Sequence, residues 1–149
     1  MVKLNKIEGA FRNLDGYLVT LRALARLSRA ELLADEARLG GAKYYLQVAV
    51  ECCVDVANHI IARQGWRAPK SYADSFAVLA EQGVIPAEFL IAARQMVGMR
   101  NRLVHLYWDV DAEVVCATLQ NNLADFERFK AAVYTYLQTP GVMEAEGNA

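Results

Sequence analysis

Residues 43–63, KYYLQVAVECCVDVANHIIAR, are the most apolar stretch of the chain and decide its fold class. Apolar residues recur here every three or four positions, as on the buried face of an α-helix: Leu46, Ala49, Cys53, Val56 and Ile60. The opposite side mixes apolar with acidic residues, including Glu51 and Asp55. We therefore predict a helix over about residues 42–63, with one face on a core and the other at an interface, a cleft or a partly solvated surface.

Three further long stretches have the same spacing of apolar residues. The predicted long helices cover about residues 4–27, 86–106 and 111–138. Capping residues predict two short helices, one between Ser28 and the pair Gly40–Gly41 and one that begins after Ser71. No stretch has the alternation typical of strands. The sequence therefore predicts an all-α, up-and-down helical bundle of four main helices plus one or two short helices.

The chain has 149 residues, enough for one domain with its own core. We predict a helical domain over residues 1–138 and a flexible C-terminal tail over residues 139–149. A hydrophobic content of 55% with 22% charged residues excludes a disordered chain. The formal net charge of −1 argues against a general nucleic-acid coat and against a polybasic membrane binder.

The sequence also indicates a cellular environment. It has no apolar run of the length of a membrane span, and its first residues are charged rather than apolar as in a signal peptide. Cys52, Cys53 and Cys116 do not have the spacing of a metal site, and we expect them to be small buried residues. We therefore expect a cytoplasmic protein that does not associate with a membrane.

The densest polar cluster is the segment 100–107, RNRLVHLY, at the end of a predicted helix. Histidine exchanges protons near neutral pH, and the arginine fork binds phosphate through two hydrogen bonds. These groups suit cleavage of RNA, in which a base takes the proton of the 2′-hydroxyl and a cation stabilises the phosphorane without a metal ion. The alternative is a structural role, because cations stabilise the C-terminal end of a helix.

Helix geometry limits how Arg100 and His105 can act together. The two residues are five positions apart, so on an ideal helix their side chains point about 140° from each other. One solution is a helix that loosens before His105. The other is a groove that a second copy of the chain completes. We favour the groove, because a two-fold dimer would supply a second arginine and a second histidine.

The cluster matches the pattern Arg-x4-His-x-Tyr and resembles the HepT-like branch of the HEPN superfamily. The resemblance extends to three segments within about residues 4–138: 43–63, 71–89 (SYADSFAVLAEQGVIPAEF) and 100–115 (RNRLVHLYWDVDAEVV). It implies a HEPN-like helical bundle that forms a homodimer with the motif residues in a shared cleft. It also implies a metal-independent endoribonuclease without a cofactor, acting as the toxin of a toxin–antitoxin pair.

The resemblance further implies a role for each motif residue. Arg100 would bind or polarise phosphate, His105 would be the acid and base, and Asn101 would orient the site through a hydrogen bond. Tyr107 would accept AMP from a cognate MntA-like nucleotidyltransferase antitoxin, which blocks the toxin. The added phosphate would lie beside Arg100 and His105 and would repel an RNA phosphate.

Other residues have weaker signals. Glu51 and Asp55 are spaced i, i+4, and we expect them to support Arg100 across the bundle; the alternative is that both face water. Two carboxylates without a third partner do not predict a metal site. His59 is expected to be a hydrogen-bonded core or interface histidine. For Trp66 and Trp108 we expect hydrophobic packing, with stacking on a base as the alternative.

An alternative function follows from the same superfamily. The chain could be a non-catalytic HEPN module that binds a nucleotide or a protein partner. Cleavage of RNA distinguishes the two functions.

Overall fold

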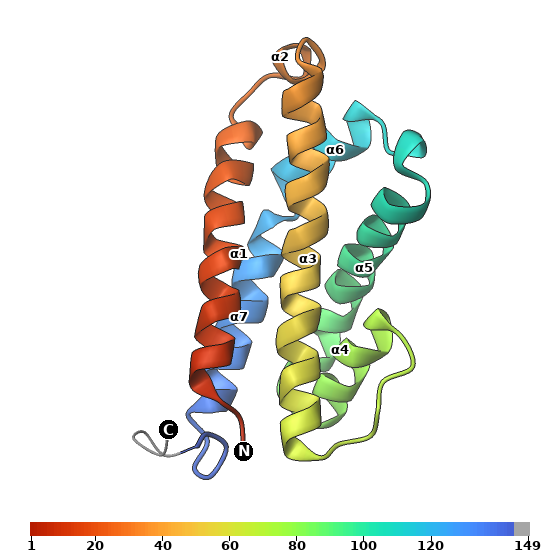
Figure 1. Cartoon of the computed structure of the whole chain (residues 1–149). Helices are drawn as coiled ribbons and strands as arrows, with labels where there is room; N and C mark the ends of the chain where they lie inside the picture. The colour runs from red at the N-terminus through yellow and green to blue at the C-terminus, as the bar shows by residue number, and fades with distance from the viewer. Residues whose placement is uncertain (145–149) are drawn as a thin grey trace.

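The computed structural model describes residues 1–144. Its four long helices run up, down, up and down in chain order (Figure 1): α1 (Leu4–Ala25), α3 (Glu36–Gln64), α5 (Leu90–His105) and α7 (Leu123–Leu137). The shorter elements are α2 (Arg29–Leu33), α4 (Tyr72–Glu81), α6 (Ala112–Asn121) and two 3₁₀ turns, η1 (Ala87–Phe89) and η2 (Tyr107–Asp109). Residues 1–144 contain no strand beyond one isolated bridge between Val2 and Met143. The predicted all-α bundle is confirmed.

Helix α3 lies at the centre of the bundle and contacts α1, α4, α5, α6 and α7. Its predicted core stripe is buried throughout, because these residues lie on one face at helical spacing. Phe129 of α7 lies at the middle of an aromatic cluster, with ring centroids 5.5 Å from Phe76, 6.2 Å from Phe11 and 6.4 Å from Phe89. The core therefore connects α1, α4, η1 and α7.

Three predicted helix starts, at Ser28, Ser71 and Asp111, are confirmed by their caps. The Ser28 hydroxyl accepts a hydrogen bond from the Glu31 N–H, and the Glu31 carboxylate accepts one from the Ser28 N–H, which is a complete capping box. The Asp111 carboxylate accepts from the Val114 N–H at 3.0 Å at the start of α6.

The predicted break at Gly40–Gly41 is wrong. Asp35 caps α3 by accepting hydrogen bonds from the N–H groups of Ala37 and Arg38, and the helix then continues through both glycines. Each glycine in a helix costs about 1 kcal/mol relative to alanine. Burial of the apolar residues that follow outweighs that cost, so α2 is shorter than predicted and α3 is longer.

The predicted last helix is two helices. At Asn122 the backbone has φ −120° and ψ −4°, which separates α6 from α7. Asparagine is a poor helix former, and two adjacent asparagines lower the local preference for helix. Leu119, Leu123 and Phe126 are all buried across the break. The spacing of the apolar residues predicted which side chains are buried. It did not predict that the helix is interrupted at Asn122.

The segment after α7 packs against the folded domain. The Val2 N–H donates to the Val142 carbonyl at 2.8 Å, the Glu144 N–H donates to the Val2 carbonyl at 3.0 Å, and Val142 is buried. The Glu144 carboxylate also pairs with Arg63 of α3. The expected flexible tail over residues 139–149 is therefore wrong for residues 142–144, and residues 145–149 lie outside the described part of the chain.

Candidate functional site

Arg100 is directed from α5 toward α3. Its Nε donates a hydrogen bond to the Glu51 carboxylate at 3.0 Å, and one terminal nitrogen donates to the Asn101 side-chain oxygen at 3.3 Å. Its guanidinium also lies 4.7 Å from the ring centroid of Tyr72. Glu51 accepts a second hydrogen bond, from the Gln47 amide at 3.2 Å. The side chain of Arg100 is only 17% exposed, so the guanidinium is held in one orientation.

His105 is the last residue of α5 and is exposed. Because α5 is helical from Leu90 to His105, it does not loosen between Arg100 and His105, and the first of the two predicted arrangements is wrong. The chain leaves the helix only at Leu106, where the backbone has φ −135° and ψ 45°. Within one chain, Arg100 therefore faces α3 while His105 faces solvent.

Tyr107 begins the turn η2 and lies against α3. The Lys43 ammonium of α3 donates a hydrogen bond to the Tyr107 carbonyl at 3.2 Å and lies 4.1 Å from the centroid of the Tyr107 ring. A Cβ atom placed on Gly40 would lie 3.6 Å from the Tyr107 hydroxyl oxygen. The tyrosine is 47% exposed, so its hydroxyl rests on the first turns of α3 while the ring remains accessible.

Sequence reasoning missed Lys43 and Gln47. Their spacing to Glu51 is i, i+4, i+8, which places Lys43, Gln47 and Glu51 along one face of α3. We call these three residues the polar row. Its two ends contact Tyr107 and Arg100, so the row connects both motif residues to the central helix. The i, i+4 spacing is a signal in the sequence, but the predicted mixed face included Glu51 and Asp55 and not Lys43 and Gln47.

Of the two acidic residues that we expected to support Arg100, one contacts it. Glu51 pairs with Arg100, whereas Asp55 is exposed and makes no ion pair with Arg100 within the described residues. Partial burial, and then the nearby Glu51, raise the pKa of Asp55. Asn101 accepts a hydrogen bond from Arg100 as described above, and its orienting role stays a prediction.

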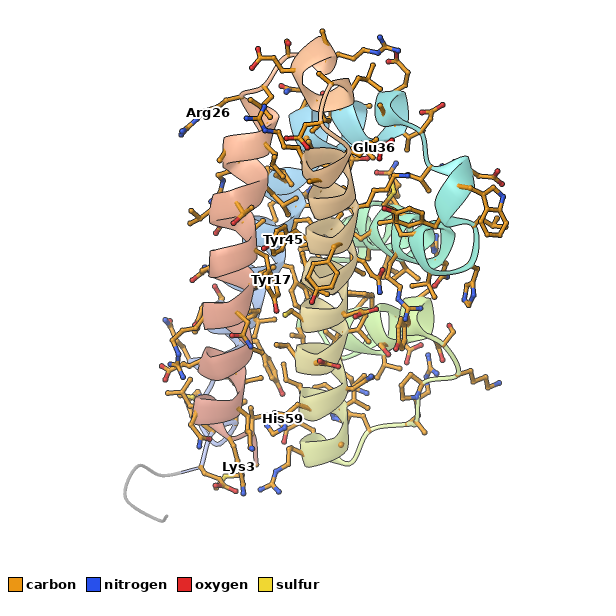
Figure 2. The ribbon with its side chains drawn as sticks, turned by 45° about the horizontal axis from the view of Figure 1, so that its top comes forward. Lys3, Tyr17, Arg26, Glu36, Tyr45 and His59 are labelled. Atoms are coloured by element: carbon orange, nitrogen blue, oxygen red, sulfur yellow. The ribbon has the colours of Figure 1, made fainter. Side chains whose placement is uncertain are left out.

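The remaining expectations concern residues away from the motif. The His59 Nε2 accepts a hydrogen bond from the Lys3 N–H at 3.2 Å where α1 begins (Figure 2), and burial followed by the charge of Arg63 lowers the pKa of its imidazole. Cys53 is buried and Cys52 is half-buried; burial, with Asp55 and Glu51 adding, raises the pKa of the Cys52 thiol to about 11. These groups are therefore structural in this fold.

The two tryptophans differ. Trp66 packs on Tyr136 with ring centroids 6.0 Å apart, as expected. Trp108 is 75% exposed, so the expected hydrophobic packing is wrong for this residue. Leu106 and Tyr107 are also exposed beside it. The end of α5 and the turn η2 therefore present an apolar surface next to the polar cluster.

The candidate site is an open surface. One hollow, of about 270 Å³, is lined by Met96 and Met99 together with residues of α3, α6 and α7, and none of Arg100, His105 and Tyr107 lines it. Within residues 1–144, no three His, Cys, Asp or Glu side chains gather in a geometry that could hold a metal ion. No helix in this part of the chain is long and apolar enough to cross a membrane.

The fold and the site define a HEPN-type helical bundle with an open polar site at the end of one helix. A family model described as Ribonuclease HepT-like matches residues 11–133, and the chain belongs to this family. Over 84 residues it is 39% identical to the mRNA nuclease HepT of Shewanella oneidensis, a match that spans 56% of this chain and 63% of that relative. Over 135 residues it is 24% identical to the tRNA nuclease HepT of Aphanizomenon flos-aquae, spanning 89% and 90% of the two chains.

Solved structures agree with these matches. A toxin–antitoxin complex with AMP-PNP aligns with a TM-score of 0.81 at 26% identity, covering 88% of this chain and 98% of that chain. A tri-AMPylated HEPN toxin from Shewanella oneidensis in complex with its MNT antitoxin aligns with a TM-score of 0.80 at 27% identity, covering 87% and 97%. The predicted resemblance is therefore confirmed.

Proposed function

We propose that this protein is the toxin of a toxin–antitoxin pair, a metal-independent endoribonuclease that is inhibited when its antitoxin transfers AMP to Tyr107. The observation that carries the proposal is the arrangement of the motif. Arg100 is fixed by Glu51, and His105 and Tyr107 lie at the exposed end of the same helix. An open site of this kind suits a long polymer better than a small molecule, which binds in enclosed pockets.

The chemistry follows from the properties of the two side chains. The imidazole of His105 takes the proton of the RNA 2′-hydroxyl, whose oxygen forms a bond to the adjacent phosphorus. The bond from phosphorus to the 5′-oxygen then breaks, and that oxygen receives a proton from a protonated His105 imidazole. Arg100 stabilises the negative charge on the phosphorane through the N–H groups that Glu51 does not use.

A homodimer is part of the proposal. Arg100 faces α3 and His105 faces solvent, so one chain does not direct both groups at one phosphate. A two-fold axis near the end of α5 would bring a second histidine toward each arginine. The exposed Leu106 and Trp108 supply apolar surface that such a contact would bury.

Inhibition by AMP transfer is supported by the described state of a relative, the tri-AMPylated HEPN toxin in complex with its MNT antitoxin. In the proposed step, the Tyr107 oxygen forms a bond to the α-phosphorus of ATP. The bond to the β-phosphate oxygen breaks, pyrophosphate leaves, and the phenol proton is released. The exposure of the Tyr107 ring is compatible with access by a partner enzyme.

Cleavage of a mixed RNA pool in EDTA tests the nuclease. We expect wild-type protein to cleave, and His105→Ala and Arg100→Ala each to lose about a hundredfold or more in rate, because each removes a group that acts in the transition state. The matched control is Glu88→Ala, an exposed residue in the turn before α5, which should cleave at the wild-type rate. The intact mass of each sample shows whether Tyr107 already carries AMP.

If wild-type protein whose mass shows no AMP does not cleave RNA, the proposed nuclease activity is contradicted. That result would support the alternative, a non-catalytic binding module. The molecular mass of the native protein in solution tests the proposed homodimer. A monomer at the protein concentration of the cleavage assay would contradict a cleft shared by two chains.

A further inference from the structure

Lys43 is the least accessible charged residue in the described part of the chain. It is 8% exposed, and the only other buried polar residue in residues 1–144 is Ser75. Placing a cation inside a protein costs free energy unless an opposite charge accompanies it. No carboxylate in the described residues lies within ion-pair distance of Lys43, whereas Arg100, at the other end of the polar row, has Glu51. Lys43 is therefore a buried residue whose ammonium has no carboxylate partner within residues 1–144.

Within residues 1–144, the hydrogen bond and the cation–π contact of the Lys43 ammonium are both with Tyr107. The ammonium donates one hydrogen bond to the Tyr107 carbonyl and lies over the Tyr107 ring. An ammonium group has three N–H donors, so two remain for another acceptor. The ring attracts the cation, but far less strongly than a full negative charge would. The Lys43 ammonium therefore has N–H donors available for an anion, on the side where Tyr107 lies.

The position of the Tyr107 hydroxyl specifies where such an anion would be. The hydroxyl belongs to the ring that Lys43 covers, and it rests beside Gly40, one turn before Lys43 on α3. A phosphorus atom bonded to the hydroxyl oxygen would lie next to the ring, within reach of the flexible lysine side chain. The phosphate of a tyrosine-bound AMP carries one negative charge, opposite to that of the Lys43 ammonium.

We infer that Lys43 binds the phosphate of the AMP group on Tyr107 and so stabilises the modified, inactive form of the toxin. The inference rests on the proposed modification of Tyr107 and adds the residue that recognises it. In the unmodified protein, Lys43 orients the turn η2 through the Tyr107 carbonyl. After modification, its free N–H groups form charge-assisted hydrogen bonds with the phosphate, which keep the nucleotide against α3.

The test compares thermal stability with and without AMP. The toxin is coexpressed with an MntA-like nucleotidyltransferase antitoxin, and intact mass identifies the modified fraction. We expect AMP to raise the Tm of the wild-type protein by about 4 °C, as expected for a new charge-assisted contact in a domain of this size. Lys43→Met should show no such rise, and Lys43→Arg should retain most of it. Lys70→Met, a change of an exposed lysine outside the polar row, should show the full rise.

A purely structural lysine predicts a different pattern. In that case Lys43→Met would lower the Tm of the modified and unmodified proteins equally, and the difference between them would remain. An equal rise in wild type and Lys43→Met would therefore overturn the inference. Wild-type protein that gains no AMP when coexpressed would overturn the proposed modification itself, and with it the role of Lys43. The intact mass therefore tests the modification of Tyr107, and the difference in Tm tests the role of Lys43.

A second measurement needs only modified wild-type protein. In a spectrum of ¹⁵N-labelled lysine ammonium groups, the Lys43 signal is assigned by its absence from Lys43→Arg. We expect it to acquire a coupling to ³¹P once Tyr107 carries AMP. A signal without this coupling in fully modified protein would contradict the inference.

Discussion

At the scale of single residues, the site depends on how Arg100 is restrained. A free arginine side chain has considerable rotamer entropy, which binding of phosphate would remove. Glu51 and the Tyr72 ring restrain it in advance, and Gln47 in turn donates to Glu51. The carboxylate uses Nε and leaves other N–H groups for phosphate. We therefore expect Glu51 to act as a positioning residue for Arg100.

Glu51→Ala tests this positioning. We expect RNA cleavage to fall about tenfold or more, because small displacements of a catalytic group are costly in rate. Glu51→Gln keeps an oxygen acceptor for Nε and should retain most activity, while Glu88→Ala again serves as an unaffected control. Measured rates that are equal for wild type and Glu51→Ala, in folded protein, would contradict the role.

At the scale of elements, α4 is connected to the loop before it by one arginine. The Arg67 guanidinium pairs with Asp74 at 2.8 Å and with Glu81 at 2.7 Å, so it bridges the two ends of α4. The hydrogen bonds from Arg67, and for Asp74 the one from the Lys70 N–H, lower the pKa of both carboxyl groups. Because Arg67 is 42% exposed, the contribution to stability is small and sensitive to salt.

The lowered pKa values give this bridge a defined pH dependence. A carboxyl whose pKa is lower in the folded state stabilises the fold above its ordinary pKa near 4, and this contribution is lost as the pH falls below that value. Arg67→Met should therefore have a lower Tm than wild type at pH 7, and the gap should narrow between pH 5 and pH 2. Thermal melts across this range check it. A Tm difference between wild type and Arg67→Met that widens as the pH falls would contradict the stabilising role of this bridge.

At the scale of the whole molecule, one core connects helices from both ends of the chain. Phe129 of α7 contacts aromatic residues of α1, α4 and η1, and it is fully buried. Edge-to-face aromatic pairs add to the stability that burial provides. Since Phe129 and its three partners come from four separate segments, the positions of these segments depend on each other.

Phe129→Ala should lower the free energy of unfolding by about 3–5 kcal/mol, the usual cost of removing a buried aromatic side chain. Urea denaturation at one fixed protein concentration measures it. Val19→Ala, at a position of α1 that is 68% exposed, should change the same quantity by less than about 0.5 kcal/mol. Similar losses for the two variants would contradict a single core around Phe129.

The sequence by itself determined the features that depend on neighbouring residues. The spacing of Leu46, Cys53 and Ile60 identified the buried face of α3, and Ser28 and Asp111 identified helix starts. These signals are local, because a cap or an apolar stripe involves residues within a few turns of each other. The motif at residues 100–107 indicated the family for the same reason, since its spacing is contained in eight residues.

Only the tertiary structure decided which distant residues meet. Lys43 meets Tyr107 across 64 positions of sequence, and Glu51 meets Arg100 across 49. The continuation of α3 through Gly40 and the packing of residues 142–144 on Val2 were likewise not predicted. In each case the free energy comes from contacts between separate segments, whose distances depend on how the helices pack. Local spacing carries no information about those distances.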